Sequence, residues 1–289
     1  MLVKIALPKG SLQEATFNLF EKAGWSFSVR SRSYTPAVDD PELDAILLRA
    51  QEIPRYVEMG AVDFGITGYD NVCECSADVV EVCELIYSKA TSKPYRWVLA
   101  APRDSDIKCA EDLEGKTVAT ELVNVTKKYF ADRKVNVKVE FSWGATEVKV
   151  PELVDAIVEG TETGSTLKAH GLAILDEILV STTRLICNKE AWADPAKREK
   201  IENIATMLQA ALTAETLSGL KMNVPREKLD AVLSLLPALN TPTINELTDK
   251  NWVALEIVVD NKALRNVIPQ VKRAGAEGIV EFPLNKVIY

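Results

Sequence analysis

The stretch Glu177–Asn188, E-I-L-V-S-T-T-R-L-I-C-N, decides the fold that the sequence predicts. It is rich in β-branched residues, which favour strands, but it is longer than a typical strand of roughly 5–6 residues. A strand of this length can cross from one domain to another. We therefore expect a first domain that the chain leaves near residue 90 and re-enters near residue 185. Two lobes joined by two crossings enclose a cleft, which is a common place for a ligand.

Apolar stretches alternate with helical patterns on the amino-terminal side of this stretch. A buried strand over 2–7 is followed by Ser11 and Glu14, whose spacing is that of a capping box and predicts a helix running to Gly24. Further strands are expected near 44–48, 62–66, 79–86, 95–101, 116–119 and 136–141, with a helix over 124–132. This alternation is typical of an α/β fold with largely parallel sheets.

The carboxyl-terminal part of the chain has a different order of elements. The patterns predict, in turn, a strand at 218–223, a helix over 226–236 that Pro225 starts, strands near 243–247 and 252–259, a helix over 261–274 and a last strand at 278–283. This βαββαβ order is the ferredoxin-like arrangement. A helix over 195–214 links it to the rest. The sequence thus predicts three parts: 1–90 with 184–214, 91–183, and 215–289.

Charge and composition exclude several classes of protein. Of the 289 residues, 34 are Lys or Arg and 42 are Asp or Glu, which gives a net charge of −8. An acidic chain argues against binding of nucleic acid or of an anionic membrane, because both need a basic face. Small anions need only a local cluster of cations. No stretch approaches the ~20 apolar residues of a membrane span. The first apolar run is too short for a signal peptide, so we expect a cytoplasmic protein.

Histidine and cysteine usage limits the chemistry further. The single histidine, His170, excludes a His-rich metal site and any mechanism with two imidazoles. Its position suggests a structural role. Cys73, Cys75 and Cys83 lie close together, but their spacing is not C-x-x-C and no second pair completes a zinc site. We interpret them as structural cysteines of a reduced protein.

The segment Asp155–Leu167, D-A-I-V-E-G-T-E-T-G-S-T-L, is the most informative for function. Its residues Thr163, Gly164, Ser165 and Thr166 predict a turn that opens a helix, where hydroxyls and N–H groups form a phosphate cradle. A capped helix without a ligand is the alternative. Asp155 and Glu159, four residues apart, would share a helix face above the cradle. Carboxylates there suit ribose hydroxyls or a magnesium ion.

Three other positions follow expected strands and favour a ligand site. The stretch G-I-T-G-Y-D, Gly65–Asp70, has the pattern of a strand-to-helix ligand loop, or of a tight turn in which Asp70 caps the helix. Lys9 lies in P-K-G-S at the end of the first strand, the end at which ligands bind in open α/β sheets. It either meets an anion or is a solvated lysine. Arg49 ends the next strand and is a second candidate cation.

Taken together, these motifs resemble the ATP phosphoribosyltransferase family over the whole chain. The resemblance rests on A-L-P-K-G-S-L, on the run from R-A-Q-E-I-P-R to G-I-T-G-Y-D, on E-L-V-N-V-T-K-K-Y-F, and on the segment from Asp155 that continues as K-A-H-G-L. It implies an α/β fold with a two-lobed, periplasmic-binding-protein-like catalytic core and a carboxyl-terminal βαββαβ, ferredoxin-like (ACT-like) regulatory domain. The implied reaction joins ATP to phosphoribosyl pyrophosphate and releases pyrophosphate, with Mg²⁺ held mainly by substrate oxygens.

The resemblance also implies roles for particular residues, none of which transfers a proton. The 5′-phosphate of the sugar would be bound by Thr161, Glu162, Thr163, Gly164, Ser165 and Thr166. The ribose would face Asp155 and Glu159, which are also the candidate metal ligands. The opposite wall, for ATP or the pyrophosphate, would carry Lys9, Arg49, Asp70 and Glu121, of which Lys9 and Arg49 would act electrostatically.

For the tail, the resemblance implies feedback inhibition by L-histidine in a homo-oligomer that shifts between an active dimer and an inhibited hexamer. The matching positions are Asn223, Leu239, Thr241, Thr243 and Gly278. The family usually has an aspartate at the position of Asn223. Two other functions remain open from the residues alone: a two-lobed solute-binding protein, which would normally carry a signal peptide, and an amino-acid-sensing regulator, which would normally carry a basic DNA-reading helix.

Overall fold

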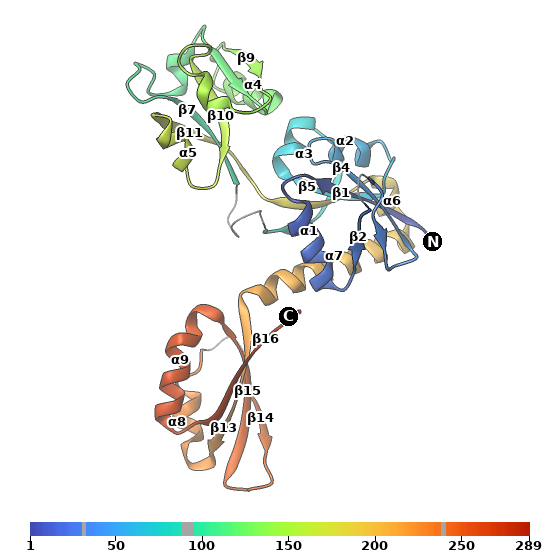
Figure 1. Cartoon of the computed structure of the whole chain (residues 1–289), viewed down its shortest axis with the longest axis vertical. Coiled ribbons are helices and arrows are strands. Elements are labelled where there is room, and N and C mark those ends of the chain that lie inside the picture. Colours follow the sequence, from blue (N-terminus) through green and yellow to red (C-terminus); the bar gives the residue numbers. More distant parts are fainter. Residues whose placement is uncertain (31–32, 88–94, 238–240) are drawn as a thin grey trace. The chain divides into compact units, whose positions relative to one another are not determined.

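The computed structural model describes residues 1–30, 33–87, 95–237 and 241–289. The chain forms two compact units, one of Met1–Glu21 with Trp25–Ala205 and the other of Lys22–Gly24 with Thr206–Tyr289. Figure 1 labels the elements of both. The larger unit contains two five-stranded sheets and the smaller unit one four-stranded sheet. The predicted α/β class is therefore confirmed.

The first sheet has the strand order β4-β1-β5-β12-β6. Its strands are β1 (Val3–Lys9), β4 (Leu43–Arg49), β5 (Phe64–Gly68), β6 (Val80–Leu85) and β12 (Thr183–Cys187). The connecting helices are α1 (Gln13–Ala23), α2 (Ile53–Glu58) and α3 (Tyr69–Cys75), and a small hairpin is formed by β2 (Phe27–Ser28) and β3 (Ala37–Val38). The apolar side chains of Ile5, Leu7 and Phe64 are fully buried, which explains why apolar residues are frequent in the central strands.

The second sheet has the order β11-β7-β10-β8-β9. Its strands are β7 (Tyr95–Pro102), β8 (Thr117–Thr120), β9 (Lys138–Phe141), β10 (Ala156–Thr161) and β11 (Leu172–Ser181). Helices α4 (Val123–Asp132) and α5 (Ser165–Ala169) and the 3₁₀ turns η1 (Ala110–Leu113) and η2 (Thr146–Lys149) connect them. A core that includes Leu99, Val118, Phe130 and Val158 packs α4 onto this sheet.

Both sheets are mixed, so the expectation of largely parallel sheets is wrong. In the first, β1 is parallel to β4 and β5, but β12 is antiparallel to β5 and β6. In the second, β8 is parallel to β9 and β10, but β7 is antiparallel to β10 and β11. Parallel pairs need a long crossover connection. The parallel pairs β1–β4 and β8–β9 are connected in this way, through α1 and α4, whereas β12 enters the first sheet directly from β11.

The stretch that was expected to form one long strand is divided at Thr182. Its first part ends β11 in the second sheet, and its second part is β12 in the first sheet. The helix expected from Ser11 begins two residues later, at Gln13. The other crossing, expected near residue 90, lies outside the described residues, and so does the predicted boundary between 90 and 91. The division of the core into lobes at those residues stays a prediction.

The smaller unit confirms the predicted βαββαβ order. It contains β13 (Leu217–Pro225), η3 (Arg226–Lys228), α8 (Leu229–Leu233), β14 (Thr243–Glu246), β15 (Trp252–Asp260), α9 (Asn261–Ala274) and β16 (Glu277–Pro283). Its sheet is antiparallel, with the order β14-β15-β13-β16. Helices α8 and α9 cover one face of it (Figure 1). The helix expected over 226–236 is shorter, because η3 replaces its first turn and α8 ends at Leu233.

Two helices precede this sheet, α6 (Lys189–Ala193) and α7 (Pro195–Glu215), and the second agrees with the expected linking helix. Within the described residues, no helix is both long enough and apolar enough to span a bilayer.

Candidate functional site

A cavity of about 410 Å³ in the larger unit collects side chains from both sheets. Asp70 and Asn71 reach it from α3 of the first sheet, and Tyr95, Trp97 and Glu159 from strands of the second. The other lining residues are Ser11, Leu12, Gln51, Gly68, Ile86, Tyr87, Glu121, Glu162, Ser181, Thr182 and Thr183. Four predicted site residues, Asp70, Glu121, Glu159 and Glu162, are therefore brought together.

Asp70 is fixed at the first turn of α3 by side chains that reach it from the second sheet. Its Oδ2 accepts a hydrogen bond from Trp97 Nε1 at 3.0 Å, and its Oδ1 accepts one from Ser181 Oγ at 2.8 Å. The residue that caps the helix is Gly68, not Asp70. A Cβ on Gly68 would overlap Asp70 Oδ1, so a larger residue would displace the Asp70 carboxylate from this turn. The reading of Asp70 as a helix cap is thus wrong.

The cavity concentrates negative charge around an aromatic ring. Burial raises the pKa of Glu159, and burial together with the nearby Asp70 raises the pKa of Glu121. Burial also raises the pKa of Tyr95, with Glu159, Asp70, Glu121 and Glu162 adding to the shift. Acidic side chains at this density attract cations and accept hydrogen bonds from hydroxyl groups. They suit a ligand that carries sugar hydroxyls or a bound cation.

The predicted phosphate cradle has the expected backbone. Thr161 ends β10, and its Oγ1 accepts a hydrogen bond from Gly164 N at 2.7 Å. Gly164 has φ +75°, in the left-handed region that favours glycine, and it precedes the first residue of α5. The hydroxyls of Thr163 and Ser165 are 2.9 Å apart. The side chains of Thr163, Ser165 and Thr166 are exposed and accessible to a ligand.

Asp155 does not share a helix face with Glu159, and that expectation is wrong. Residues Ala156–Thr161 form strand β10, in which positions four apart lie about 13 Å from each other along the strand. Asp155 Oδ2 instead accepts a hydrogen bond from Thr117 N at 2.9 Å, and its Oδ1 lies 3.7 Å from Lys116 Nζ. Its carboxylate stabilises the start of the parallel β8–β10 pair, whereas Glu159 reaches the cavity.

Lys9 and Arg49 lie side by side at the ends of the parallel strands β1 and β4, where their positions pair in register. The Nζ of Lys9 lies 3.5 Å above the centre of the Tyr34 ring. Arg49 is exposed, and one of its guanidinium nitrogens lies 3.4 Å from the position of a Cβ on Gly10. These two cations are not among the described residues that line the cavity.

In the part of the chain that the structure describes, no group of three or more His, Cys, Asp or Glu side chains is arranged to hold a metal ion. Cys73, Cys75 and Cys83 are free thiols. Burial raises the pKa of each, and that of Cys83 reaches about 12, so these thiols are protonated at neutral pH and are poor metal ligands.

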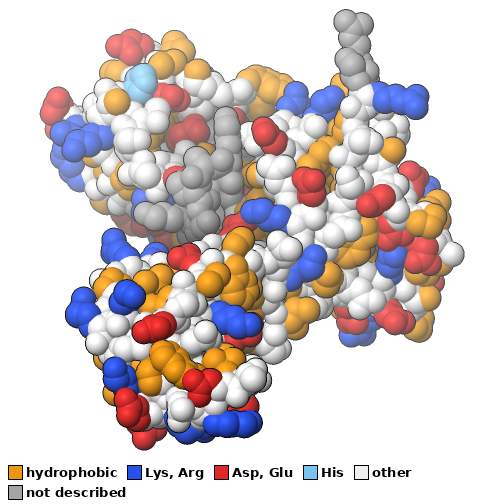
Figure 2. All heavy atoms as spheres, turned by 60° about the horizontal axis from the view of Figure 1, so that its bottom comes forward, with side chains coloured by type: hydrophobic (Ala, Val, Ile, Leu, Met, Phe, Trp, Pro, Cys, Tyr) orange, Lys and Arg blue, Asp and Glu red, His pale blue; other side chains and the backbone are white. Residues whose placement is uncertain are grey.

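His170 is exposed at the carboxyl-terminal end of α5, and the single pale-blue side chain of Figure 2 lies at the surface. On the same view, basic and acidic side chains are interspersed. The backbone N–H of His170 donates to Thr166 O at 3.1 Å. Its described contact thus closes the last turn of α5.

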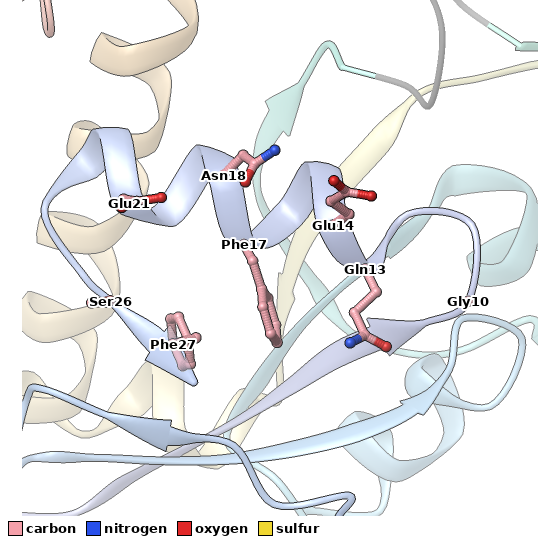
Figure 3. Close-up of a pocket in the computed structure, with 8 residues that line it drawn as sticks. All are labelled: Gly10, Gln13, Glu14, Phe17, Asn18, Glu21, Ser26 and Phe27. Carbon is pink, nitrogen blue, oxygen red and sulfur yellow. The ribbon is translucent and has the colours of Figure 1, made fainter. Parts of the chain in front are cut away.

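A second cavity, of about 570 Å³, is larger but lies over α1 (Figure 3). Its described lining shares no residue with the first cavity and contains none of the predicted site residues. Phe17 and Phe27 stack at 5.6 Å on one side of the helix, whereas Glu14 and Asn18 project from the other (Figure 3). We assign the chemistry to the smaller cavity, because the predicted carboxylates meet there.

Most of the residues that line the cavity were not predicted from the sequence, among them Tyr95, Trp97 and Ser181. Tyr95 and Trp97 alternate at the start of β7, and Ser181 ends β11 in the stretch that decides the fold. All three therefore lie close to the crossings between the sheets. Polar and aromatic side chains at such positions are the signal by which they could have been found.

In the smaller unit, only part of the predicted histidine site comes together. A Cβ on Gly278, which has φ +57°, would lie 3.4 Å from Asn223 Nδ2, so β13 and β16 bring these two residues together. Thr243 is exposed on β14, with β15 between it and β13, and Thr241 is exposed just before β14. Leu239 lies outside the described residues.

Comparisons with known proteins find one family along almost the whole chain. A family model described as ATP phosphoribosyltransferase matches residues 49–210, and one described as HisG, C-terminal domain, matches residues 214–286. ATP phosphoribosyltransferase from Prosthecochloris aestuarii is 59% identical over 99% of this chain and 98% of its own length. The enzyme of that name from Pelotomaculum thermopropionicum is 56% identical over the full length of both chains.

Solved structures show a similar fold. A chain of the ATP phosphoribosyl transferase (HisG:HisZ) complex from Thermotoga maritima is 29% identical, with a TM-score of 0.64 over 73% of this chain and 99% of that one. Tv2483 bound to L-arginine is 11% identical, with a TM-score of 0.50 over 74% of this chain and 86% of that one, and it shows a likeness of fold alone.

Proposed function

The chain belongs to the ATP phosphoribosyltransferase family, and we propose that the cavity shared by its two mixed sheets is the place of that family's reaction. The enzyme transfers the phosphoribosyl group of phosphoribosyl pyrophosphate to ring nitrogen 1 of ATP and releases pyrophosphate, the first step of histidine biosynthesis. The observation that carries the placement is the meeting of Asp70, Glu121 and Glu159 in one cavity.

The reaction needs positioning more than proton transfer. Ring nitrogen 1 of adenine already holds a lone pair, so it attacks the anomeric carbon of the sugar without a strong general base. The protein must align the two substrates and stabilise the charge that develops on the leaving pyrophosphate. A cavity with fixed carboxylates and without an imidazole agrees with this requirement.

For the sugar substrate, we assign the 5′-phosphate to the loop from Thr161 to Thr166. The left-handed Gly164 and the exposed hydroxyls of Thr163 and Ser165 support this role, because a phosphate binds where backbone N–H groups and hydroxyls converge. Glu162 belongs to the same loop and also lines the cavity. Glu159, which lies on β10 two residues before Thr161, accepts hydrogen bonds from the ribose hydroxyls. Asp155 takes no part in this assignment.

The opposite wall is assigned to ATP and the leaving pyrophosphate. Asp70 lines it from α3, held by Trp97 and Ser181, whereas Glu121, just before α4, faces it from the second sheet's side of the cavity. Lys9 and Arg49 stand at the carboxyl ends of β1 and β4, where anions bind in α/β sheets. They contribute positive potential toward the phosphates from outside the cavity lining.

Enzymes of this family use a divalent metal, and we propose Mg²⁺. The residues fit an ion that arrives with the substrates: Glu121, Glu159 and Glu162 offer the oxygen atoms that Mg²⁺ prefers, yet the described residues form no closed cage. When bound, Mg²⁺ neutralises charge on the pyrophosphate. The carboxylates of the chain would hold the ribose and attract the ion.

We also propose that the tail regulates the enzyme by binding L-histidine in a homo-oligomer that shifts between dimer and hexamer, in the cytoplasm. Asn223 and Gly278 are close together, but Thr243 lies two strands away in the sheet. One chain therefore offers two partial sites, and a complete one requires a second copy. Asn223 in place of the usual aspartate provides no charge attraction for the ligand, which lowers affinity.

The first test measures pyrophosphate release with ATP and phosphoribosyl pyrophosphate. Release that requires both substrates supports the proposed reaction. Binding of a small solute without turnover would instead identify a two-lobed binding protein, and a response to an amino acid alone would identify a sensing regulator.

The second test measures sedimentation and activity with and without L-histidine. Asn223→Asp is expected to strengthen inhibition, whereas Asn245→Asp, which adds the same charge to β14 of the same sheet, is expected to behave as the wild type. If L-histidine changes neither assembly nor rate in any of the three proteins, the tail has another role.

A further inference from the structure

Helix α4 begins without a cap of its own. The first N–H groups of a helix have no partner within it and need an acceptor from elsewhere. The residue at the N-cap position is Leu122, whose side chain has no acceptor atom and makes no capping bond within the described residues. The first turn of α4 therefore depends on another element.

That element is α3, which belongs to the first sheet. Both carboxylate oxygens of Glu74 lie 2.9 Å from Asn124 N, and Oε2 also accepts from Val125 N at 3.0 Å. The side-chain amide of Asn124 donates to Glu74 O at 2.9 Å, so backbone and side chain of one residue contact the same turn. A carboxylate at a helix amino terminus forms charge-assisted hydrogen bonds and interacts favourably with the helix dipole.

The two helices that Glu74 joins carry opposite walls of the cavity. Asp70 lies one turn before Glu74 on α3, and Glu121 lies just before α4. At its other end, α3 is tied to the second sheet by the hydrogen bonds of Asp70 with Trp97 and Ser181. The spacing between the two walls thus depends on contacts at both ends of α3.

We propose that Glu74 is a positioning residue for the transfer reaction, which caps α4 from the opposite wall and holds Glu121 at the correct distance from Asp70. This role rests on the proposed placement of the substrates in the cavity. Glu74 is half-buried and is not among the described residues that line the cavity. It acts through α4 and does not touch the substrates.

The test compares Glu74→Ala and Glu74→Gln with two matched controls. Glu58 Oε1 accepts a hydrogen bond from Asp78 N at 2.8 Å, and Glu114 Oε2 accepts one from Asn136 N at 2.7 Å. Each control carboxylate binds a backbone N–H that belongs to the elements around its own sheet. Glu58→Gln and Glu114→Gln therefore remove the same chemistry without separating the two walls.

We expect kcat/KM for both substrates to fall about tenfold or more in Glu74→Ala, because the variant loses the charge-assisted hydrogen bonds to the first turn of α4. Glu74→Gln keeps one acceptor and is expected to fall less. The controls should retain wild-type kinetics. Hydrogen exchange of the Asn124 and Val125 amides should accelerate in the two Glu74 variants and not in the controls.

The kinetics of Glu74→Ala are measured well below its melting temperature. If its kcat/KM is unchanged although exchange at Asn124 is faster, the positioning role is overturned, because the cap then affects only the first turn of α4 and not the cavity. Equal losses in the Glu58 and Glu114 variants would overturn it as well. A wild type that shows no turnover with ATP and phosphoribosyl pyrophosphate overturns the proposed function and the positioning role with it. Rapid exchange of the Asn124 and Val125 amides in the wild type overturns the cap alone.

Discussion

We expect any side chain at position 160 to destabilise the protein, because the ring of Tyr95 lies against Gly160. It is on β10, opposite Trp97 of β7, and has no left-handed backbone that would require glycine. A Cβ at this position would overlap Cε1 and the hydroxyl oxygen of Tyr95. Gly160→Ala must therefore displace the Tyr95 ring from the cavity.

The cost can be worked out from these contacts. Forcing one extra carbon into a packed region typically costs about 1–3 kcal/mol. Tyr95 also packs edge-to-face against Trp97, with 5.9 Å between the ring centres, and such a pair is worth about 0.5–1.5 kcal/mol. We expect Gly160→Ala to lower the free energy of unfolding by about 1–3 kcal/mol and to raise KM, since Trp97 in turn holds Asp70.

A double-mutant cycle measured by denaturant unfolding checks the cause. In a Tyr95→Ala background the obstructing ring is gone, so adding Gly160→Ala should be neutral, or should stabilise by about 0.4–1 kcal/mol through the unfolded chain. If Gly160→Ala costs the same in both backgrounds, the clash with Tyr95 is not the reason for glycine at this position, and the reasoning fails.

Three further predictions concern the cradle, the carboxylates and the metal. Gly164→Val puts a branched side chain at φ +75°, with its Cβ about 3.3 Å from Ile174 Cδ1. Turnover of phosphoribosyl pyrophosphate should therefore fall more than tenfold in a protein that stays folded by circular dichroism. Near-normal kinetics would exclude the assignment of the phosphate to this turn. Because burial raises the pKa of Glu159, the folded state binds the proton of this carboxyl more tightly than the unfolded state does. The free energy of unfolding should therefore decline as pH rises from the ordinary carboxyl pKa through the raised one. Glu159→Gln should remove that decline in pH-dependent melting curves and should melt at a higher temperature than the wild type at neutral pH. Excess chelator should abolish pyrophosphate release, and added Mg²⁺ should restore it. The melting curve should stay unchanged, because the described residues form no metal cage. Full activity in chelator would refute the role of the ion.

Patterns between near neighbours in the chain determined much of this structure. The βαββαβ order of the tail follows from alternating and helical periodicities with turn residues between them, and each element lies close to its predicted place. The turn to which we assign the phosphate was also readable as a turn, because the hydroxyls and Gly164 are consecutive and it is made by residues within one short segment. The approximate crossing at residues 177–188 was visible because a β-branched run of that length exceeds one strand.

The same local patterns were ambiguous where one residue spacing is compatible with both a helix and a strand. Asp155 and Glu159 are four apart, which places them on one face of a helix but far apart along a strand, and the pairing of β10 with β7 and β8 decided for the strand. The direction of strand pairing was equally hidden: β1 runs parallel to β4 and β5 whereas β12 runs antiparallel to β5 and β6, and a pattern along one strand does not show which strands it will pair with.

Only the tertiary structure could assemble the cavity. Asp70 meets Trp97 across 27 residues and Ser181 across 111, and Glu74 caps α4 from 50 residues away. Leu122 at the start of α4 indicates in the sequence that the cap is missing, but not which residue provides it. Periodicity reports which face of an element is apolar, a property of neighbours along the chain. The partners of polar groups are set by strand register and by the packing of distant elements, and a single sequence does not record them.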